Sequence, residues 1–286
     1  MLSLLVTAAL AGATPTPTPT PTATPIAPTT DVRQAAQAAG FADIADRLAE
    51  AARPTTMVAP GKRKAAPAMP GTSRYGGGAD LPVEGKWPRC KGRRQAFLAQ
   101  VRLSDLPAGA DELRRLGGTL LFFTDVQSEA GETEYGMWAG DCSKVIHVPA
   151  GTPVRRQART KRMLVIKPAR MRFTARPDIP DLDFDYALMP PLQDINVKDK
   201  LDPYWDMRWA LQGKTYPQDK LLGYSNQMNG GDECSARAEL PTGTWRHLFT
   251  FTTWEVADGG RLQLLISSED LAAGRFDRVC GTFDSA

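Results

Sequence analysis

RYGGGADLP, at residues 74–82, opens a pattern that occurs twice in the chain. This glycine-centred turn is followed by an apolar run at 96–101, then by a second glycine turn and another apolar run at 118–123. The same order returns further along the chain, at 220–224, 246–251 and 260–265. A repeated segment of this length predicts a fold of two related halves that share one core.

Short apolar runs with turn signals predict strands beyond residue 72. The clearest hairpin joins 248–254 to 261–266 across Asp258-Gly259-Gly260, because glycine accepts the positive φ of a tight turn. Further strands are expected at 96–101, 119–124, 144–148 and 162–167, and helices at 106–116, 203–212 and 269–274, the last capped by Ser268. The loops between the strands rule out a regular β-α-β alternation. We therefore expect an α+β fold with mainly antiparallel sheets.

Three segments of different character precede the predicted strands. Residues 1–13 are apolar and end in small-residue triplets, which indicates a signal peptide, although no Lys or Arg precedes the run. Residues 14–30 form a Thr/Pro-rich linker, either a stalk or an unconstrained leader. Apolar residues at helical spacing predict an amphipathic N-terminal helix at 31–52.

These boundaries predict one domain over residues 31–286. Its first half spans about 72–167 and its second half about 215–286, as the positions of the two copies indicate. With 286 residues, 42% of them hydrophobic, the chain is long enough for a sizeable core. No apolar run reaches the roughly 20 residues that a membrane-spanning helix needs.

Charge gives little indication of a partner. A net charge of +3 points neither to nucleic acid nor to a membrane surface. The strongest local charge is at 155–176, which holds nine Lys and Arg residues and no acid. Because acidic residues follow at once and aromatic residues are scarce, we expect these cations to pair within the chain, with nucleic-acid binding as the minority alternative. The acidic residues Asp178, Asp181, Asp183 and Asp185 are expected to be solvated.

The chain has four cysteines, Cys90, Cys142, Cys234 and Cys280. Their spacing is too wide for a structural zinc site, so no metal is expected. An even number after a signal peptide favours two disulfides and an exported, periplasmic or extracellular protein. Among three connectivities, Cys90 with Cys142 and Cys234 with Cys280 comes first, because each pair lies within one half. The alternative is four free thiols in a cytoplasmic protein.

No catalytic motif is found. Cys142 and His147 are five residues apart, so on one strand their side chains face opposite ways. Ser143 and His147 share a face but lack a nucleophile turn and an orienting acid. With two histidines, the chain cannot form a three-histidine metal site by itself. Gly76-Gly77-Gly78 precedes no helix with a Lys and a hydroxyl, which excludes a phosphate-binding loop, and no cofactor is expected.

Several of these segments resemble one known family. They are Arg53-Pro54, SRYGG at 73–77, DLP at 80–82, WP at 87–88 and FLAQV at 97–101, followed in the second half by KLLGY at 220–224, GGRL at 259–262 and the segment 266–271. Together they are similar to the YwqG-like family (domain of unknown function family 1963) over roughly residues 45–284. The resemblance implies an internally duplicated α+β domain and a family without an established activity. The leader, the linker, the four cysteines and Asn226-Gln227 depart from the family pattern.

We expect an uncharacterised, non-catalytic binding or interaction module, monomeric or weakly associating. Its partner would be an unknown protein or a small polar ligand in the space between the halves. Pockets form at such junctions, which makes Tyr75, Trp87, Tyr224 and Trp254 the first candidate ligand contacts, with core packing as the alternative. One rival is a hydrolase or transferase that uses carboxylates such as Glu255 and Asp258. Another is an immunity-like protein that binds and blocks a second protein.

Overall fold

The computed structural model describes residues 28–61, 69–124, 142–158, 166–182, 198–213, 219–225, 245–252 and 261–284. Its helices are α1 (Pro28–Ala38), α2 (Ala45–Ala51), α3 (Asp111–Arg114), α4 (Leu201–Gln212) and α6 (Ser268–Ala273). Short 3-10 turns occur at η1 (Ala42–Ile44), η2 (Leu103–Asp105) and η6 (Lys198–Lys200). No helix among the described residues combines the length and the apolar character that crossing a membrane requires.

The strands of the main sheet are β1 (Arg53–Pro60), β2 (Arg74–Tyr75), β6 (Ala96–Arg102), β7 (Thr119–Thr124), β8 (Lys144–Val148), β10 (Ala169–Asp178), β11 (Asp219–Leu222), β12 (Trp245–Thr252), β13 (Arg261–Ser267) and β14 (Cys280–Asp284). Two ribbons pair β3 (Ala79–Pro82) with β9 (Val154–Gln157) and β4 (Arg89–Cys90) with β5 (Arg93–Arg94). All described pairings are antiparallel, and the α+β class with antiparallel sheets is confirmed.

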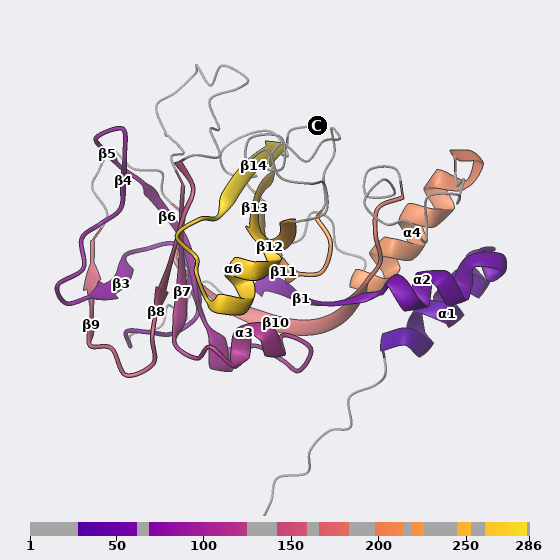
Figure 1. Cartoon of the computed structure of the whole chain (residues 1–286), viewed down its shortest axis with the longest axis horizontal. Helices are drawn as coiled ribbons and strands as arrows, with labels where there is room; N and C mark the ends of the chain where they lie inside the picture. Colours follow the sequence, from indigo (N-terminus) through magenta and orange to yellow (C-terminus); the bar gives the residue numbers. More distant parts are fainter. Residues whose placement is uncertain are drawn as a thin grey trace, which may run out of the picture.

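The ten described strands of the main sheet follow the order β14-β13-β12-β11-β1-β10-β2-β6-β7-β8 (Figure 1). The order is balanced about the β1–β10 pair, because β11 to β14 extend from β1 as β2, β6, β7 and β8 extend from β10. The pairing register shifts by one residue in both β6 and β12, after Phe97 and after His247. Beyond this shift Ala99 pairs with Phe122 and Phe249 with Leu264, as in the alignment of the two sequence copies. The internal duplication itself stays a prediction.

The main sheet curls so that strands from both copies enclose one apolar core. Phe122 of β7 stacks on Phe249 of β12, with ring centroids 4.6 Å apart. The rings of Tyr75 in β2 and Phe251 in β12 also pack together, with their centroids 6.1 Å apart. Such aromatic pairs contribute about 0.5–1.5 kcal/mol beyond the burial of their area. Residues remote in sequence are thereby joined within one hydrophobic cluster.

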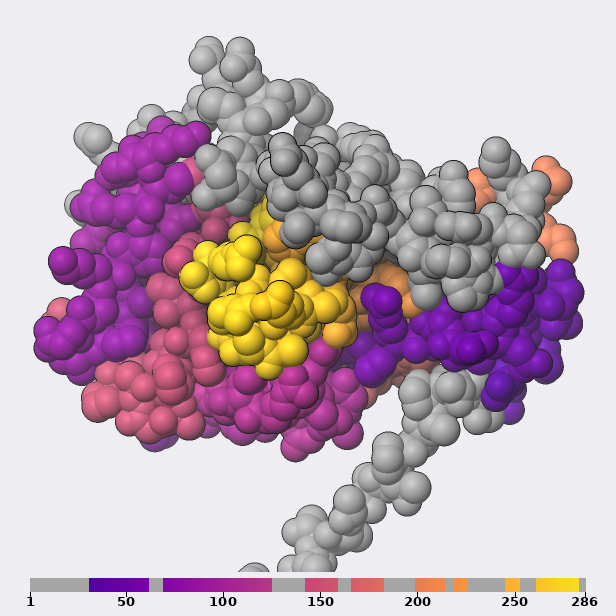
Figure 2. All heavy atoms as spheres, in the orientation of Figure 1, coloured from indigo at the N-terminus to yellow at the C-terminus, as the bar shows by residue number. Residues whose placement is uncertain are grey.

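A second apolar cluster lies between α1, α2 and α4, at one end of the molecule (α1 and α2 are indigo in Figures 1 and 2). Leu48 of α2 and Tyr204 of α4 are fully buried there. Phe41 meets Tyr204 edge to face, with ring centroids 5.6 Å apart. The predicted amphipathic segment 31–52 is divided at Gly40, the glycine expected to interrupt it, whose φ of 84° follows the end of the first helix.

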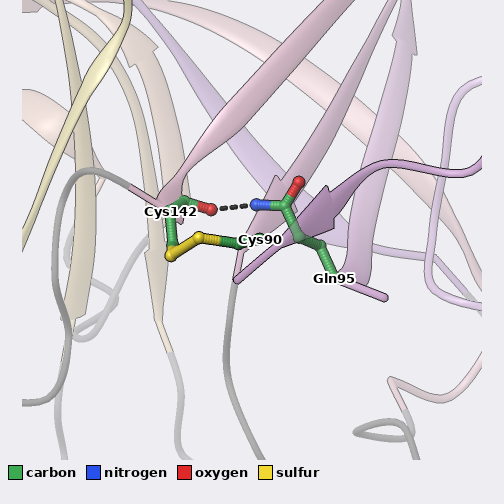
Figure 3. Close-up of a disulfide and its surroundings, with 3 residues drawn as sticks. All are labelled: Cys90, Gln95 and Cys142. Atoms are coloured by element: carbon green, nitrogen blue, oxygen red, sulfur yellow. Dashed lines mark hydrogen bonds between the residues drawn. A yellow bond between two sulfur atoms is a disulfide. The ribbon is translucent and has the colours of Figure 1, made fainter. Parts of the chain in front are cut away.

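The disulfide between Cys90 and Cys142 is present, with the Cα atoms 5.6 Å apart (Figure 3). It joins the β4–β5 ribbon to the segment that enters β8. The side-chain amide of Gln95 donates a hydrogen bond to the carbonyl of Cys142 beside it (Figure 3). Cys280 is also in a disulfide. Cys234 lies outside the described residues, so its pairing with Cys280 stays a prediction.

The structure also corrects local expectations. Ser267, not Ser268, caps α6, because its hydroxyl accepts the backbone N–H of Asp270 at 3.0 Å. The helix expected at 106–116 is reduced to α3. Residues 162–165 and the hairpin turn at 258–260 lie outside the described residues, and 166–167 belong to no strand.

Candidate functional site

A fully buried carboxylate, that of Asp178 at the end of β10, is the centre of a polar cluster that also includes Lys220 and His247 of the second half. It accepts hydrogen bonds from Lys220 Nζ at 2.7 Å, from Gln212 Nε2 at 2.6 Å and from the backbone N–H of Tyr224 at 2.9 Å. Burial raises the pKa of Asp178, but the charges of Lys220 and Arg208 outweigh it and hold the pKa below its ordinary value. Asp178 is therefore ionised and fully paired.

Arg208 of α4 connects this cluster to the neighbouring backbone. Its Nη1 donates to Asp181 at 2.8 Å, and its Nε and Nη2 donate to the carbonyls of Ile179 at 3.0 Å and Ser225 at 3.1 Å. The expectation that Asp178 and Asp181 are solvated is wrong, because both carboxylates are buried against cations. Asp183 and Asp185 lie outside the described residues.

His247 of β12 completes the cluster as a neutral group. Burial, reinforced by the charge of Lys220, lowers its pKa to about 3. Its Nδ1 lies 2.8 Å from the carbonyl of Leu222, which assigns the ring proton to Nδ1. Its Nε2 then accepts from the Thr250 hydroxyl at 2.7 Å. Both ring nitrogens are occupied, so this histidine is a structural group.

The KLLGY motif forms the turn that closes over Asp178. Leu222 and Gly223 both have positive φ, 61° and 76°. A Cβ on Gly223 would collide with the Asp178 carboxylate and with the side chain of Thr55. The motif is therefore needed because the backbone must pass this close to the ion pair.

The first half contains a comparable cluster around Asp80. Its carboxylate accepts Arg74 Nη1 at 2.7 Å, Arg156 Nε at 2.9 Å, Gln100 Nε2 at 2.9 Å and the backbone N–H of Gly71 at 2.7 Å. Burial raises the pKa of Asp80, but the hydrogen bonds from Arg156 and Arg74 lower it to about 2. Asp80 is thus a poor proton acceptor.

The two clusters occupy matching places in the sheet. Arg74 lies opposite Gln100 in β6, as Lys220 lies opposite Thr250 in β12. Two residues after each cation come two consecutive residues of positive φ, Gly76 and Gly77 after Arg74, Leu222 and Gly223 after Lys220. In both places a cation therefore lies buried beneath the same kind of turn.

The cluster around Asp80 borders an open pocket of about 360 Å³. The pocket is lined by Asp80, Arg102 and Ser104, by the turn at Gly117-Gly118-Thr119, and by residues 148–152 and Val154 with Gly71. Arg102 Nε donates to the carbonyl of Gly71 at 2.8 Å, which fixes its guanidinium at the pocket. This pocket is the candidate binding site.

A carboxyl group with a raised pKa lies where β11 begins. Asp219 is half-buried and accepts the backbone N–H of Thr252 at 2.7 Å. Burial raises the pKa of Asp219 to about 6, although hydrogen bonds from Tyr75 and Thr252 oppose the rise. Burial and the neighbouring Asp219 raise the pKa of Tyr75 well above 10. The pair links a strand of one half to a strand of the other.

The predicted ligand contacts lie in separate neighbourhoods. Tyr75 is in the shared core. Trp87 is buried against Phe123, and its Nε1 donates to the Gln95 carbonyl at 2.8 Å. Tyr224 is buried beneath the guanidinium of Arg53, which lies 4.3 Å from the ring centroid. Trp254 lies outside the described residues, and a ligand-binding role for any of the four stays a prediction.

The residues considered for catalysis have other contacts. Cys142 is in its disulfide, Ser143 is buried, and His147 Nε2 lies 2.8 Å from the carbonyl of Gly117. Glu255 and Asp258 lie outside the described residues. Within the described ranges, no three His, Cys, Asp or Glu side chains gather as a metal site would require.

Sequence reasoning missed Arg102, Asp80 and the Asp178–Lys220 pair. The signal for the two buried cations was present, since Arg74 and Lys220 begin the two copies. Asp178 had no such signal, because it precedes Lys220 by 42 residues.

Gly223→Ala tests the close approach at the KLLGY turn. A positive φ alone costs an alanine about 1–2 kcal/mol, and the collision with Asp178 adds to it, so we expect a loss of about 3 kcal/mol or more. Gly151→Ala is the matched control, because Gly151 has a φ of 81° but nothing within 4 Å of the added Cβ. Urea denaturation of both variants measures the difference. Equal losses would contradict the account.

Asp219→Asn tests the raised carboxyl pKa. A folded pKa of about 6, above the ordinary 3.8, means that the folded state holds the proton more tightly than the unfolded state. The stability from this group is therefore present below about pH 4 and lost as the pH rises through about 6. Relative to the natural chain, D219N should gain at most about 3 kcal/mol between those pH values. Urea titrations across this range check it, and a difference that does not vary with pH would refute it.

Comparison with known proteins places these features in one family. The family model described as "Domain of unknown function (DUF1963)" matches residues 73–285. No curated protein matches the chain. The matched range includes the side chains of both polar clusters, both turns and the pocket-lining residues other than Gly71. The chain belongs to the DUF1963 family.

Proposed function

We propose that the chain is a non-catalytic binding module that takes a small ligand with an anionic group in the pocket beside Arg102. The observation that carries the proposal is the open pocket itself, whose volume of about 360 Å³ lies within the range of ligand sites. It borders one of the two buried ion clusters, and a fixed guanidinium stands at its wall.

Arg102 supplies the recognition chemistry. Its Nε is held by Gly71, and its Nη atoms have no partner among the described residues. A guanidinium presents a planar set of donors that matches a carboxylate or another oxyanion. The nearby charge of Asp80 does not oppose an anion, because Arg74 and Arg156 both neutralise it.

The rest of the lining favours an apolar body on the ligand. Val148, Pro149, Ala150 and Val154 line the pocket on the side of β8 and β9. Asp80, with its pKa of about 2, is unsuited to take a proton near neutrality. These features support binding rather than acid–base chemistry.

One observation favours a second candidate function, a hydrolase or transferase with a carboxylate-based site. The half-buried carboxyl of Asp219 has a pKa of about 6, which suits proton transfer near neutrality. The backbone N–H of Thr252 already donates to this carboxyl, as it would in a structural role. We therefore rank this candidate second.

We also propose that the protein is exported. The Cys90–Cys142 disulfide supports this, because disulfides persist mainly in oxidising compartments.

Comparing a carboxylate ligand with its neutral amide tests whether binding depends on the anionic group. Benzoate should bind the protein in calorimetric titrations and benzamide should bind much more weakly, because only the acid can pair with Arg102. Arg102→Gln should weaken benzoate binding about tenfold or more, the effect of losing a charge-assisted hydrogen bond.

Arg33→Gln is the matched control, since Arg33 is an exposed arginine of α1 that pairs with Asp46. It should leave benzoate binding unchanged. Equal binding of acid and amide, or equal affinity in R102Q and the natural chain, would overturn the proposal.

A further inference from the structure

The β4–β5 ribbon concentrates positive charge on the surface. Residues 86–94, KWPRCKGRR, contain five basic residues and no acidic residue. The side chains of Lys86, Arg89, Lys91, Arg93 and Arg94 are all exposed. The ribbon lies at the end of the molecule opposite α1 and α2 (Figures 1 and 2). We call residues 86–94 the cationic hairpin.

Two arginines of the cationic hairpin lie side by side. In the β4–β5 register Arg89 is opposite Arg94, and Cys90 is opposite Arg93. Opposite residues of an antiparallel pair share one face, with Cβ atoms about 5 Å apart, and like charges there are destabilising. Neither Arg89 nor Arg94 makes an ion pair with a described carboxylate, since Arg89 Nη1 bonds to the Gly92 carbonyl at 2.6 Å and Arg94 lies 5.8 Å from the Trp87 ring centroid. A bound anion would therefore offset the repulsion between the guanidinium groups of Arg89 and Arg94.

Covalent and local contacts hold this unfavourable arrangement in place. The turn residues Lys91 and Gly92 have positive φ of 48° and 80°, as a two-residue hairpin turn requires. The Cys90–Cys142 disulfide fixes the ribbon to the sheet (Figure 3). Gln95 adds hydrogen bonds to the carbonyls of Pro88, at 3.0 Å, and Cys142. The two guanidinium groups are thus preorganised, which lowers the entropy cost of binding.

We propose that Arg89 and Arg94 bind a phosphate group of a linear phosphate polymer. Guanidinium groups match phosphate oxygens through paired hydrogen bonds, and a phosphate offers enough oxygens for two of them. Lys86, Lys91 and Arg93 add exposed positive charge on the same hairpin, which attracts a polymer of repeated phosphates.

The hairpin is less suited to a membrane surface. Insertion into the interface of a bilayer needs apolar side chains that enter the lipid, whereas charge alone gives only attraction to an anionic surface. Among the described residues, the exposed large hydrophobic side chains are Met69, Val83 and Trp209, outside the cationic hairpin. Trp87, its aromatic residue, is buried. This interface is independent of the pocket beside Arg102.

Fluorescence anisotropy with labelled inorganic polyphosphate tests the proposal. The natural chain should bind, and the logarithm of its affinity should fall linearly with that of the salt concentration. R89Q/R94Q should weaken binding about tenfold or more, since charge-assisted hydrogen bonds are lost. R33Q/R114Q removes two exposed arginine charges elsewhere, from α1 and α3, and should bind nearly as the natural chain does.

Two further variants separate geometry from charge. R89K/R94K keeps the charge without the planar donors and should bind more weakly than the natural chain. C90A/C142A, checked for folding by circular dichroism, should also bind more weakly, because the hairpin loses its preorganisation.

Equal losses in R89Q/R94Q and R33Q/R114Q would overturn the proposal, because binding would then follow net charge alone. Equal affinity for polyphosphate and polyglutamate would also overturn it, as would binding to phosphatidylglycerol vesicles without binding to polyphosphate.

Discussion

The buried ion pair between Asp178 and Lys220 is the interaction that joins β10, β11 and α4. The carboxylate of Asp178 accepts hydrogen bonds from the side chains of Lys220 and Gln212 and from the backbone N–H of Tyr224. Residues of β10, β11 and α4 therefore contact one buried group. Breaking such a pair leaves a charge in the interior, which typically costs about 3–5 kcal/mol. The KLLGY turn follows from this constraint, since only glycine at 223 lets the backbone pass beside the carboxylate.

A similar constraint has a different outcome in the first half. Arg74 and Lys220 occupy matching places, and each is paired with a carboxylate beneath a turn of two residues with positive φ. Lys220 is sealed completely, whereas the Arg74–Asp80 cluster borders the pocket that contains Arg102. The proposed binding site therefore lies beside the first of these two clusters.

The sequence predicted the elements whose apolar runs are continuous. β7 and β8 occur at the expected residues, and β6, β12 and β13 lie within a few residues of the expected strands. β1 was missed because it contains Pro54 and Pro60, and β10 was missed because its arginines were assigned to the basic run at 155–176, although their alternation with apolar residues is a strand pattern. The Asp178–Lys220 pair was missed because its two residues are 42 positions apart, whereas Asp80 was missed although Arg74 lies only six residues before it. Aromatic residues were predicted to contact a ligand. Of these, Tyr75, Trp87 and Tyr224 are buried, and their ligand-binding role stays a prediction.

The central claim is that Asp178 and Lys220 act together as one structural unit. A double-mutant cycle with Asp178→Asn and Lys220→Met, measured by urea denaturation, tests it most directly. Because each single variant leaves a buried partner unpaired, the account predicts that the double variant is more stable than the sum of the two losses implies, by about 2 kcal/mol or more. Additive losses would contradict the account, because they would mean that the two groups stabilise the fold independently.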